Sequence, residues 1–336
     1  MKLFPNLRPN KGEVIFLSFT GLLSWLIFVY YLMKNMYTIR FDEWGYYNIS
    51  TQILSSGLFS LAEELRTYMF PLFIAIFRLL DVGDETYTKA IFSLFQYLIY
   101  VFTIILIAHL SWRIKPSKIS AYSILFIGLL NPYLIQSTTY YLTDLLSSCF
   151  IVISIIFAAR TNLNNGFNFF ITIGLLFINL MIRPANAIFF PAIFLVLLIR
   201  LWRKEFKLTI KLVLIGIAQL VFLLPQLYNN VVHLHKWTPL LAKDLYSTQA
   251  TWGAQYLKYA TVFREGEDPQ LFYNNPYHPY VPGDTTTIFQ LIFDNLQVFL
   301  LTISAHLFGV LDWGYIDAFI TDFYPVSRIV GSIYLY

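Results

Sequence analysis

The stretch IRFDEWGYYN, residues 39–48, places adjacent carboxylates, Asp42 and Glu43, among aromatic side chains. A carboxylate at a membrane surface can act as a general base that takes a proton from an attacking hydroxyl, or it can bind a divalent metal ion. Adjacent side chains on a helix point about 100° apart, so the two acids do not face the same ligand atom. One acid can therefore reach a substrate while the other orients the helix. The simpler alternative is that Asp42 only caps a helix.

A second polar group follows in SLAEELRTYMFPLF, residues 60–73, which contains Glu63, Glu64 and Arg66. The guanidinium of an arginine offers a planar fork that fits a phosphate. Glu64 adds a carboxylate that could share a divalent metal ion with Asp42, and the residue types leave open whether a metal is present. Together these residues suit chemistry on a phosphate-linked lipid.

The composition indicates that lipid surrounds most of the chain. Among the 336 residues, 57% are hydrophobic and 12% are charged, against about a quarter charged in an average soluble protein. Because apolar runs of roughly 17–25 residues cross a bilayer core, we predict an all-α polytopic membrane protein with about eight or nine transmembrane helices. The predicted spans are Val14–Met33, Ala90–Leu110, Ile119–Ile135, Leu142–Ala159, Phe167–Ile182, Ala187–Leu201, Leu208–Leu227, Ile288–Val310 and one that begins near Phe319.

Positive charge predicts the orientation of these spans. The first span is too long for a signal-peptide core and lacks an Ala-x-Ala-like cleavage site, so we expect it to be retained. Lysine and arginine gather in the cytoplasmic connections of membrane proteins, and here they fall in alternate connections. The N-terminus is therefore expected in the cytoplasm, on the side that carries Arg8, Lys11, Arg113, Lys115, Lys118, Arg160, Arg200, Arg203, Lys204, Lys207 and Lys211.

The segments 34–89 and 228–287, with the short turn 131–141, then face the periplasm or exterior. In 34–89, apolar and aromatic side chains from Trp44 onward have the spacing of an interfacial helix that ends at Gly57. Met69–Leu80 is too short to span and predicts a second helix at the outer leaflet. We divide the chain into a membrane module (1–227) with the outer segment 34–89, a second outer segment (228–287) and C-terminal membrane segments (288–336).

Other features limit the possible functions. The sequence ends within an apolar stretch, which fits either a truncated product or a terminal interfacial segment. A lone cysteine, Cys149, excludes an internal disulfide framework and is expected to pack in a span. The net charge of +4 is spread over loops without a basic block, so we expect no nucleic-acid partner.

Taken in order, the motifs resemble those of the GT-C membrane glycosyltransferases, which include protein O-mannosyltransferases and the transferases that add aminoarabinose to lipid A. The matching features are a first span, an exterior Asp-Glu, a helix that ends in glycine, and charged residues before FPL at 70–72. Asn131-Pro132 followed by YYLTD at 140–144, and MIRPAN at 181–186, are similar to two further turns of the family. The resemblance covers residues 14–227, and the order and placement of short motifs carry it.

The resemblance implies transfer of a sugar from a polyprenyl-phosphate donor. It implies that Asp42 is the catalytic carboxylate, that Glu43 supports it, and that Arg66 faces the donor phosphate. Arg183 is a second candidate for binding that phosphate, and its alternative is to reach lipid headgroups.

Four further residues receive supporting or substrate-binding roles. Glu64 lies near the place of a second family carboxylate, and Asp144 opens a helix that it could equally stabilise by capping. Tyr277 and His278 suit contact with a sugar, although Tyr and Pro also mark plain interfacial turns. Whether the site binds a divalent metal ion stays open; if it does, Asp42 and Glu64 are the expected ligands.

The expected function is that of an inverting glycosyltransferase in the inner or plasma membrane, with its site on the non-cytoplasmic face. The acceptor would be a lipid-linked glycan, an envelope polysaccharide or a protein. One alternative is an O-antigen ligase or polymerase, which depends on arginines and histidine in a large outer segment. Another is a lipid-glycan flippase or transporter, which should carry ionisable or helix-breaking residues at mid-membrane.

Overall fold

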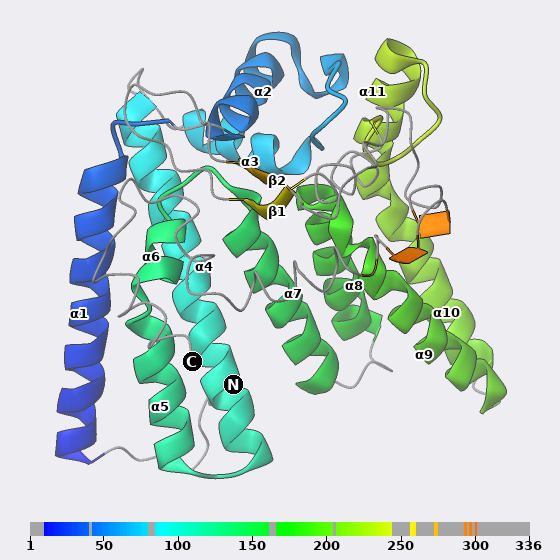
Figure 1. The fold of residues 1–336 in the computed structure, drawn as a ribbon. Coiled ribbons are helices and arrows are strands. Elements are labelled where there is room, and N and C mark those ends of the chain that lie inside the picture. The colour runs from blue at the N-terminus through cyan, green and yellow to red at the C-terminus, as the bar shows by residue number, and fades with distance from the viewer. Residues whose placement is uncertain are drawn as a thin grey trace. The chain divides into compact units, whose positions relative to one another are not determined.

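The computed structural model describes residues 10–39, 42–79, 85–160, 166–203, 206–243, 256–259, 272–274, 292–293, 296–297 and 300. The chain divides into two units, Met1–Ala242 and Lys243–Tyr336, which we describe separately. The described part of the first unit is helical throughout (Figure 1). Its α-helices are α1 (Lys11–Asn35), α2 (Asp42–Ser56), α3 (Met69–Arg78), α4 (Glu85–Ile114), α5 (Lys118–Leu129), α6 (Pro132–Ser137), α7 (Thr143–Arg160), α8 (Gly166–Ile182), α9 (Phe190–Trp202), α10 (Phe206–Ala218) and α11 (Leu224–Leu234).

Three short 3₁₀ helices complete the first unit: η1 (Leu58–Ser60), η2 (Pro184–Phe189) and η3 (Gln219–Leu223). In the second unit, β1 (Tyr256–Tyr259) and β2 (Phe272–Asn274) form an antiparallel pair in which Tyr256 lies opposite Asn274. The predicted spans at Ile288–Val310 and near Phe319 lie almost wholly outside the described residues.

The helices have the length and composition of a membrane protein. Within the described residues, three helical stretches are long and apolar enough to cross a bilayer: Lys11–Asn35, Thr86–Ile114 and Thr209–Leu234. Four shorter apolar helices accompany them, at Met69–Arg78, Lys118–Leu129, Thr143–Ala158 and Gly166–Ile182. Large apolar side chains such as Phe19, Leu22 and Leu26 are exposed on α1, which suits contact with lipid tails rather than water.

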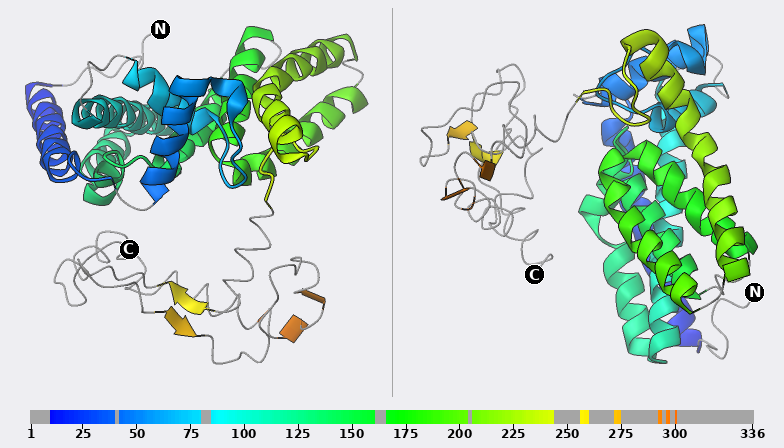
Figure 2. Two further views of the ribbon diagram at one scale, coloured as in Figure 1. Left: turned by 90° about the horizontal axis from the view of Figure 1, so that it is seen from above. Right: turned by 90° about the vertical axis from the view of Figure 1, so that its right-hand side faces the viewer.

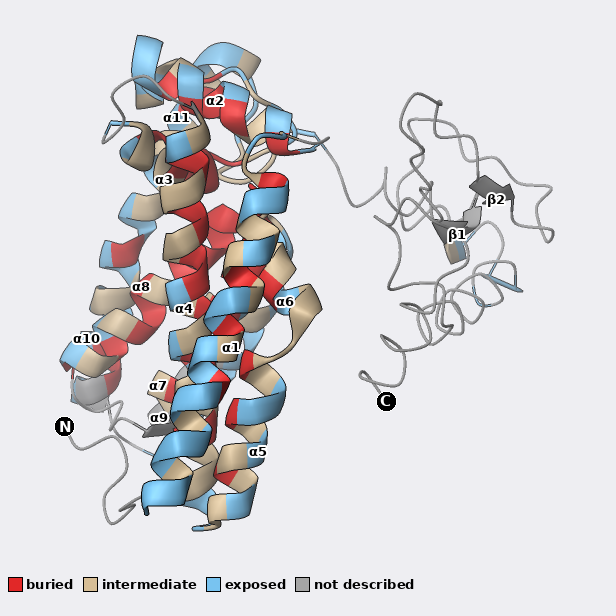
Figure 3. Ribbon diagram, turned by 90° about the vertical axis from the view of Figure 1, so that its left-hand side faces the viewer, coloured by how far each residue is buried: buried red, intermediate tan, exposed pale blue. Residues whose placement is uncertain are grey.

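The long helices run lengthwise beside one another, and α2 and α3 lie at one end of them (Figure 1). The turned views show the same arrangement, with α11 reaching that end as well (Figure 2). Contacts link α1 with α4 and α5, α4 with α7, α7 with α8, and α8 with α10. Buried residues face these neighbours, while exposed residues follow the outer sides of α1 and α5 (Figure 3). Cys149 is buried, as predicted.

Several helix boundaries follow directly from residue chemistry. Asn10 and Glu13 form a reciprocal capping box at the start of α1, with both hydrogen bonds at 2.8 Å. The two helices predicted within residues 34–89 are present as α2 and α3. Gly57 follows α2 at φ 91°, a left-handed conformation that costs glycine little and other residues much more.

Two predicted boundaries are wrong. The expected span Ile119–Ile135 is interrupted, because α5 ends at Leu129 and Asn131 caps the separate helix α6 through the amides of Tyr133 and Leu134. Pro132 lacks an amide proton and favours the first turn of a new helix. The second boundary is the end of Leu208–Leu227, since helical structure continues through η3 and α11 to Leu234.

The end opposite α2 carries Lys11, Lys115 and Lys118, three of the residues that the sequence analysis assigned to the cytoplasmic side. Lys118 begins α5 and donates to both carboxylate oxygens of Glu13, at 2.9 Å each. The starts of α1 and α5 therefore lie together; Arg113 lies in the last turn of α4, and Lys115 lies in the connection that leads to α5. Residues 36–39, the connection 130–142 and the segment 183–189 lie at the other end.

Close packing of α4 against α5 gives a test of this arrangement. A Cβ atom at Gly128 would lie 2.7 Å from the side chain of the buried Ile104, whereas a Cβ at Gly21 on α1 meets nothing within 4 Å. We expect Gly128→Ala to destabilise the protein by about 1–3 kcal/mol through overpacking. Gly21→Ala, the matched control, should be neutral or slightly stabilising. Thermal unfolding in detergent measures both, and equal stability of the two variants would contradict the packing.

Candidate functional site

The first turn of α2 separates the adjacent acids into different environments. The side chain of Asp42 is 75% exposed, whereas that of Glu43 is 1% exposed. This separation follows from the angle between neighbouring side chains on a helix. Asp42 is therefore the acid that can meet a substrate, and Glu43 belongs to the interior.

Asp42 forms an ion pair with Arg66, a contact that the sequence analysis did not predict. Arg66 Nη2 donates to Asp42 Oδ1 at 3.0 Å. The guanidinium lies against Gly45, where a Cβ atom would come within 2.5 Å of Arg66 Cζ. It also lies over the ring of Tyr46, 5.1 Å from the centroid. The absence of a side chain at Gly45 thus allows Arg66 to lie along the first turn of α2.

A second arginine–aspartate pair joins α7 to the end of α8. Arg183, the residue after α8, donates to Asp144 Oδ1 in the first turn of α7. Both side chains are open to solvent, with 45% of Arg183 and 64% of Asp144 exposed. The hydroxyl of Thr67 donates to the carbonyl of Met181, so the segment that carries Arg66 is fixed to the end of α8 close to Arg183.

Tyr46 connects the two ion pairs. Burial raises the pKa of its phenol, as do the charges of Asp42 and Asp144 to a smaller extent, while a hydrogen bond with Thr143 and the charge of Arg66 lower the pKa. The phenol therefore stays protonated at neutral pH. Arg66 contacts the ring of Tyr46, and its neighbour Thr67 bonds to Met181 close to Arg183, so the two pairs lie near each other at this end of the helices.

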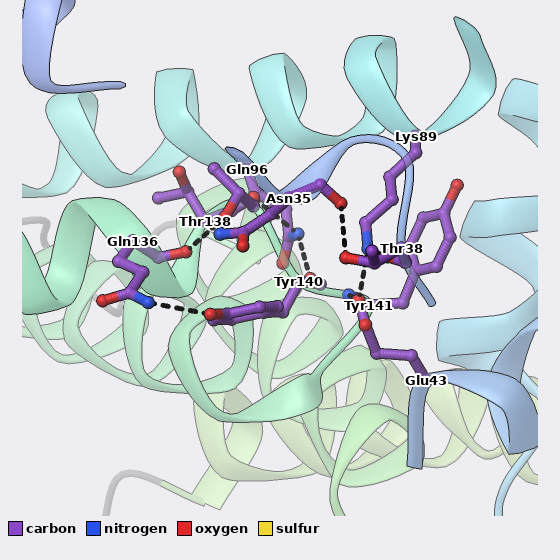
Figure 4. Close-up of polar contacts among 10 residues, drawn as sticks. Asn35, Thr38, Glu43, Lys89, Gln96, Gln136, Thr138, Tyr140 and Tyr141 are labelled. Carbon is purple, nitrogen blue, oxygen red and sulfur yellow. Dashed lines mark hydrogen bonds and ion pairs between the residues drawn. The ribbon is translucent and has the colours of Figure 1, made fainter. Parts of the chain in front are cut away.

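Glu43 and Lys89 form a buried ion pair behind Asp42. Lys89 Nζ lies 2.9 Å from Glu43 Oε1, and the same carboxylate oxygen accepts the backbone N–H of Tyr141 at 2.7 Å. Lys89 also donates to the carbonyl of Thr38 and lies 5.4 Å from the ring centroid of Tyr141. Figure 4 shows these side chains meeting between the α1–α2 connection, α4 and the segment before α7.

A hydrogen-bond network holds the connection from α6 to α7. Gln96 Nε2 on α4 donates to the carbonyls of Thr138 at 3.1 Å and Tyr140 at 2.8 Å (Figure 4). Asn35 Nδ2, at the end of α1, donates to the hydroxyl of Thr139 at 2.9 Å. Side chains of α1 and α4 therefore hold the backbone that leads to Asp144. The sequence analysis did not identify this hydrogen-bond network.

Helix α11 holds the Leu58–Tyr68 segment, another arrangement that the sequence analysis missed. Gln226 Oε1 accepts the N–H of Tyr68 at 3.2 Å, and Asn229 Nδ2 donates to the carbonyl of Leu58 at 2.9 Å. His233 Nε2 bonds to the carbonyl of Phe59 at 2.9 Å. The signal was present, because Gln226, Asn229 and His233 follow helical spacing and form a polar stripe across the end of the predicted span Leu208–Leu227.

The remaining predicted residues are placed as follows. Glu64 pairs with Lys236 at 3.9 Å. Within the described residues, no group of three or more His, Cys, Asp or Glu side chains is arranged to hold a metal ion. Tyr277 and His278 lie outside the described residues. The structure thus brings together Asp42, Arg66, Asp144 and Arg183, with Glu43 directly behind them.

Comparisons with known proteins add no relative to this description. No protein-family model matches the sequence, and no curated protein or solved structure is significantly similar to it.

The different burial of the two adjacent acids can be tested by chemical labelling. A water-soluble carbodiimide with an amine nucleophile should modify Asp42 and Asp144 rapidly, because 75% and 64% of their side chains are exposed. Glu43 should stay unmodified until the protein unfolds, because its side chain is 1% exposed. Peptide mass spectrometry of native and denatured samples measures the modification. Equal labelling of Asp42 and Glu43 in the native protein would contradict the site geometry.

Proposed function

We propose that this chain is an integral membrane glycosyltransferase that takes its sugar from a polyprenyl-phosphate donor. The observation that carries the proposal is the pair of exposed aspartates, Asp42 and Asp144, each held by an arginine around Tyr46 at one end of apolar helices. Arginine is suited to a phosphate, and an exposed carboxylate to an acceptor hydroxyl. A donor already activated as a lipid phosphate reaches such a site from the bilayer.

The geometry supports a reaction in which arginine changes partner. The donor phosphate competes with Asp42 for Arg66 and with Asp144 for Arg183, because phosphate and carboxylate both accept from guanidinium. Asp42 is then free to take the proton of the acceptor hydroxyl. The acceptor oxygen bonds to the anomeric carbon while the bond from that carbon to the phosphate oxygen breaks. The polyprenyl phosphate leaves with the electron pair, and Arg66 and Arg183 stabilise its charge.

Attack from the face opposite the phosphate inverts the anomeric carbon. Within this proposal Glu43 orients the site, and Glu64 lies at its edge beside Lys236. The acceptor is a lipid-linked glycan, an envelope polysaccharide or a protein. The proposed setting is a GT-C-type module of eight or nine spans in the inner or plasma membrane, with a cytoplasmic N-terminus and the Asp42 site on the other face. Three described helical stretches that are long and apolar enough to cross a bilayer support a membrane location.

Replacing the proposed base tests the reaction directly. Asp42→Asn keeps the size of the side chain but removes its basicity, so we expect sugar transfer to fall by about 10²–10⁴-fold. The measurement is transfer by protein in liposomes supplied with a panel of polyprenyl-phosphate sugars and candidate acceptors. Glu13→Gln removes a carboxylate at the opposite end of the helices and should leave transfer unchanged. Wild-type transfer by Asp42→Asn would refute the role of Asp42.

Binding of farnesyl phosphate tests the phosphate site without any reaction. Arg66→Gln removes a charge-assisted hydrogen bond, so we expect affinity to fall by about 10–100-fold. Farnesol, which has the same chain and no phosphate, should bind wild type and variant equally.

The matched control for this experiment is Arg78→Gln. Arg78 bonds to the hydroxyls of Ser50 and Thr51 within the same outer segment and makes no contact with Asp42. The Arg78→Gln variant should therefore bind farnesyl phosphate with the wild-type affinity. If Arg66→Gln binds the phosphate with unchanged affinity, Arg66 has no role in donor binding.

A further inference from the structure

We propose that the buried Glu43–Lys89 ion pair is a positioning device that fixes both exposed aspartates of the site at once. The inference rests on the proposed function for its catalytic consequence, and on the described contacts for its geometry. Lys89 is assigned no role by the sequence motifs, where it only marks the end of the 34–89 segment. Neither Glu43 nor Lys89 is open to a substrate, so both act through other residues.

Burial gives this pair a single arrangement. The side chains of Glu43 and Lys89 are 1% and 2% exposed, and their charged atoms lie 2.9 Å apart. A buried charge is tolerated when it is paired and hydrogen-bonded, and it becomes costly when its partner is removed. Additional bonds to the Tyr141 amide and the Thr38 carbonyl satisfy the two groups further. The pair therefore resists rearrangement more than an exposed ion pair does.

The connections of Glu43 lead to both aspartates. Asp42 precedes Glu43 in the first turn of α2, so fixing the Glu43 side chain fixes the backbone from which Asp42 projects. The same carboxylate accepts the amide of Tyr141, three residues before Asp144. Lys89 completes the arrangement from α4 and binds the carbonyl of Thr38, in the chain just before α2 (Figure 4). One ion pair thus fixes the distance between the Asp42 and Asp144 backbones.

The other half of α2 has a separate attachment, which provides a control. Arg78 Nη1 on α3 donates to Ser50 Oγ at 2.9 Å and to Thr51 Oγ1 at 2.6 Å. Its guanidinium also lies 4.3 Å from the centroid of the Tyr47 ring. Removing Arg78 takes away the bonds to Ser50 and Thr51, and neither of these residues bonds to Glu43 or Lys89 in the contacts described above. A general loss of α2 packing can therefore be distinguished from loss of the Glu43 anchor.

Lys89→Met is the first test, with Arg78→Met as control. In Lys89→Met, amide hydrogen exchange should rise about tenfold or more in residues 42–46 and 141–145, because both segments lose their common anchor. The rate of sugar transfer, divided by the number of sites that bind farnesyl phosphate, should fall on the order of 10²-fold. A misplacement of a catalytic group by about 1 Å lowers reaction rates by that amount. The stoichiometry of farnesyl phosphate binding should stay at the wild-type value. A merely structural defect would lower the stoichiometry and the rate together.

The double variant Glu43→Gln/Lys89→Met covers the case in which Lys89→Met fails to fold. It leaves no unpaired buried charge, so it should fold where the single variant is too unstable. The amide oxygen introduced by Glu43→Gln can still accept the Tyr141 N–H. We therefore expect residues 141–145 to keep part of their protection from hydrogen exchange, while residues 42–46 exchange faster. Transfer per bound site should still fall by at least about tenfold. Arg78→Met should raise exchange near Ser50 and Thr51 only, with transfer per bound site at the wild-type value.

The outcomes separate this inference from the proposed function. If the double variant shows wild-type exchange in residues 42–46 and wild-type transfer, the positioning role is wrong even though the protein is a glycosyltransferase. If wild-type protein transfers no sugar from any donor tested, the proposed function fails. The exchange data would then still decide whether the ion pair anchors both segments, because that measurement needs no substrate.

Discussion

Removal of charge from water is the constraint on which the α2 end of this protein depends. The chain has few charged residues, and it places one acid and one base, Glu43 and Lys89, almost completely out of solvent. Each of these groups is acceptable only because the other is present, and together they require α2, α4 and the segment before α7 to meet at one point. The exposed aspartates differ from Glu43, since water can reach them. The proposed reaction uses this difference: the buried pair stays fixed while the donor phosphate competes with the aspartates for their arginine partners.

Much of the architecture could be predicted from the sequence, because local chemistry determines it. The apolar runs, Gly57 after α2 and Pro71 near the start of α3 each leave a local signal, and these helices lie where expected. The breaks within longer apolar runs were harder to place. At Asn131–Pro132 the run stays apolar while the backbone is interrupted, and at η3 the helix tightens but continues to α11. Hydropathy averages over such changes in the backbone. It therefore predicts that a segment is apolar enough to cross a membrane better than it predicts where each helix begins and ends.

The site itself was predictable only in part, for a different reason. Asp42, Arg66, Asp144 and Arg183 were selected by type and order, and the spacing on a helix indicated that Asp42 and Glu43 must diverge. The sequence does not indicate which acid faces inward, because that depends on Lys89 and Tyr141, which are distant in sequence. The polar side chains of α11 that hold the Leu58–Tyr68 segment are likewise long-range partners. Pairings of this kind arise from packing among helices, which local periodicity does not encode.

The grouping of arginines with aspartates around Tyr46 has an electrical consequence. The formal charges of Asp42, Asp144, Arg66 and Arg183 add to zero, so these four groups produce little field beyond their immediate surroundings. An anion in solution is therefore not drawn to them from a distance, and recognition begins only on contact. Under the proposed function, a lipid-borne phosphate, which diffuses in two dimensions along the bilayer, would lose little from the lack of such steering. Soluble phosphates and nucleotides would gain no long-range electrostatic advantage from these four groups.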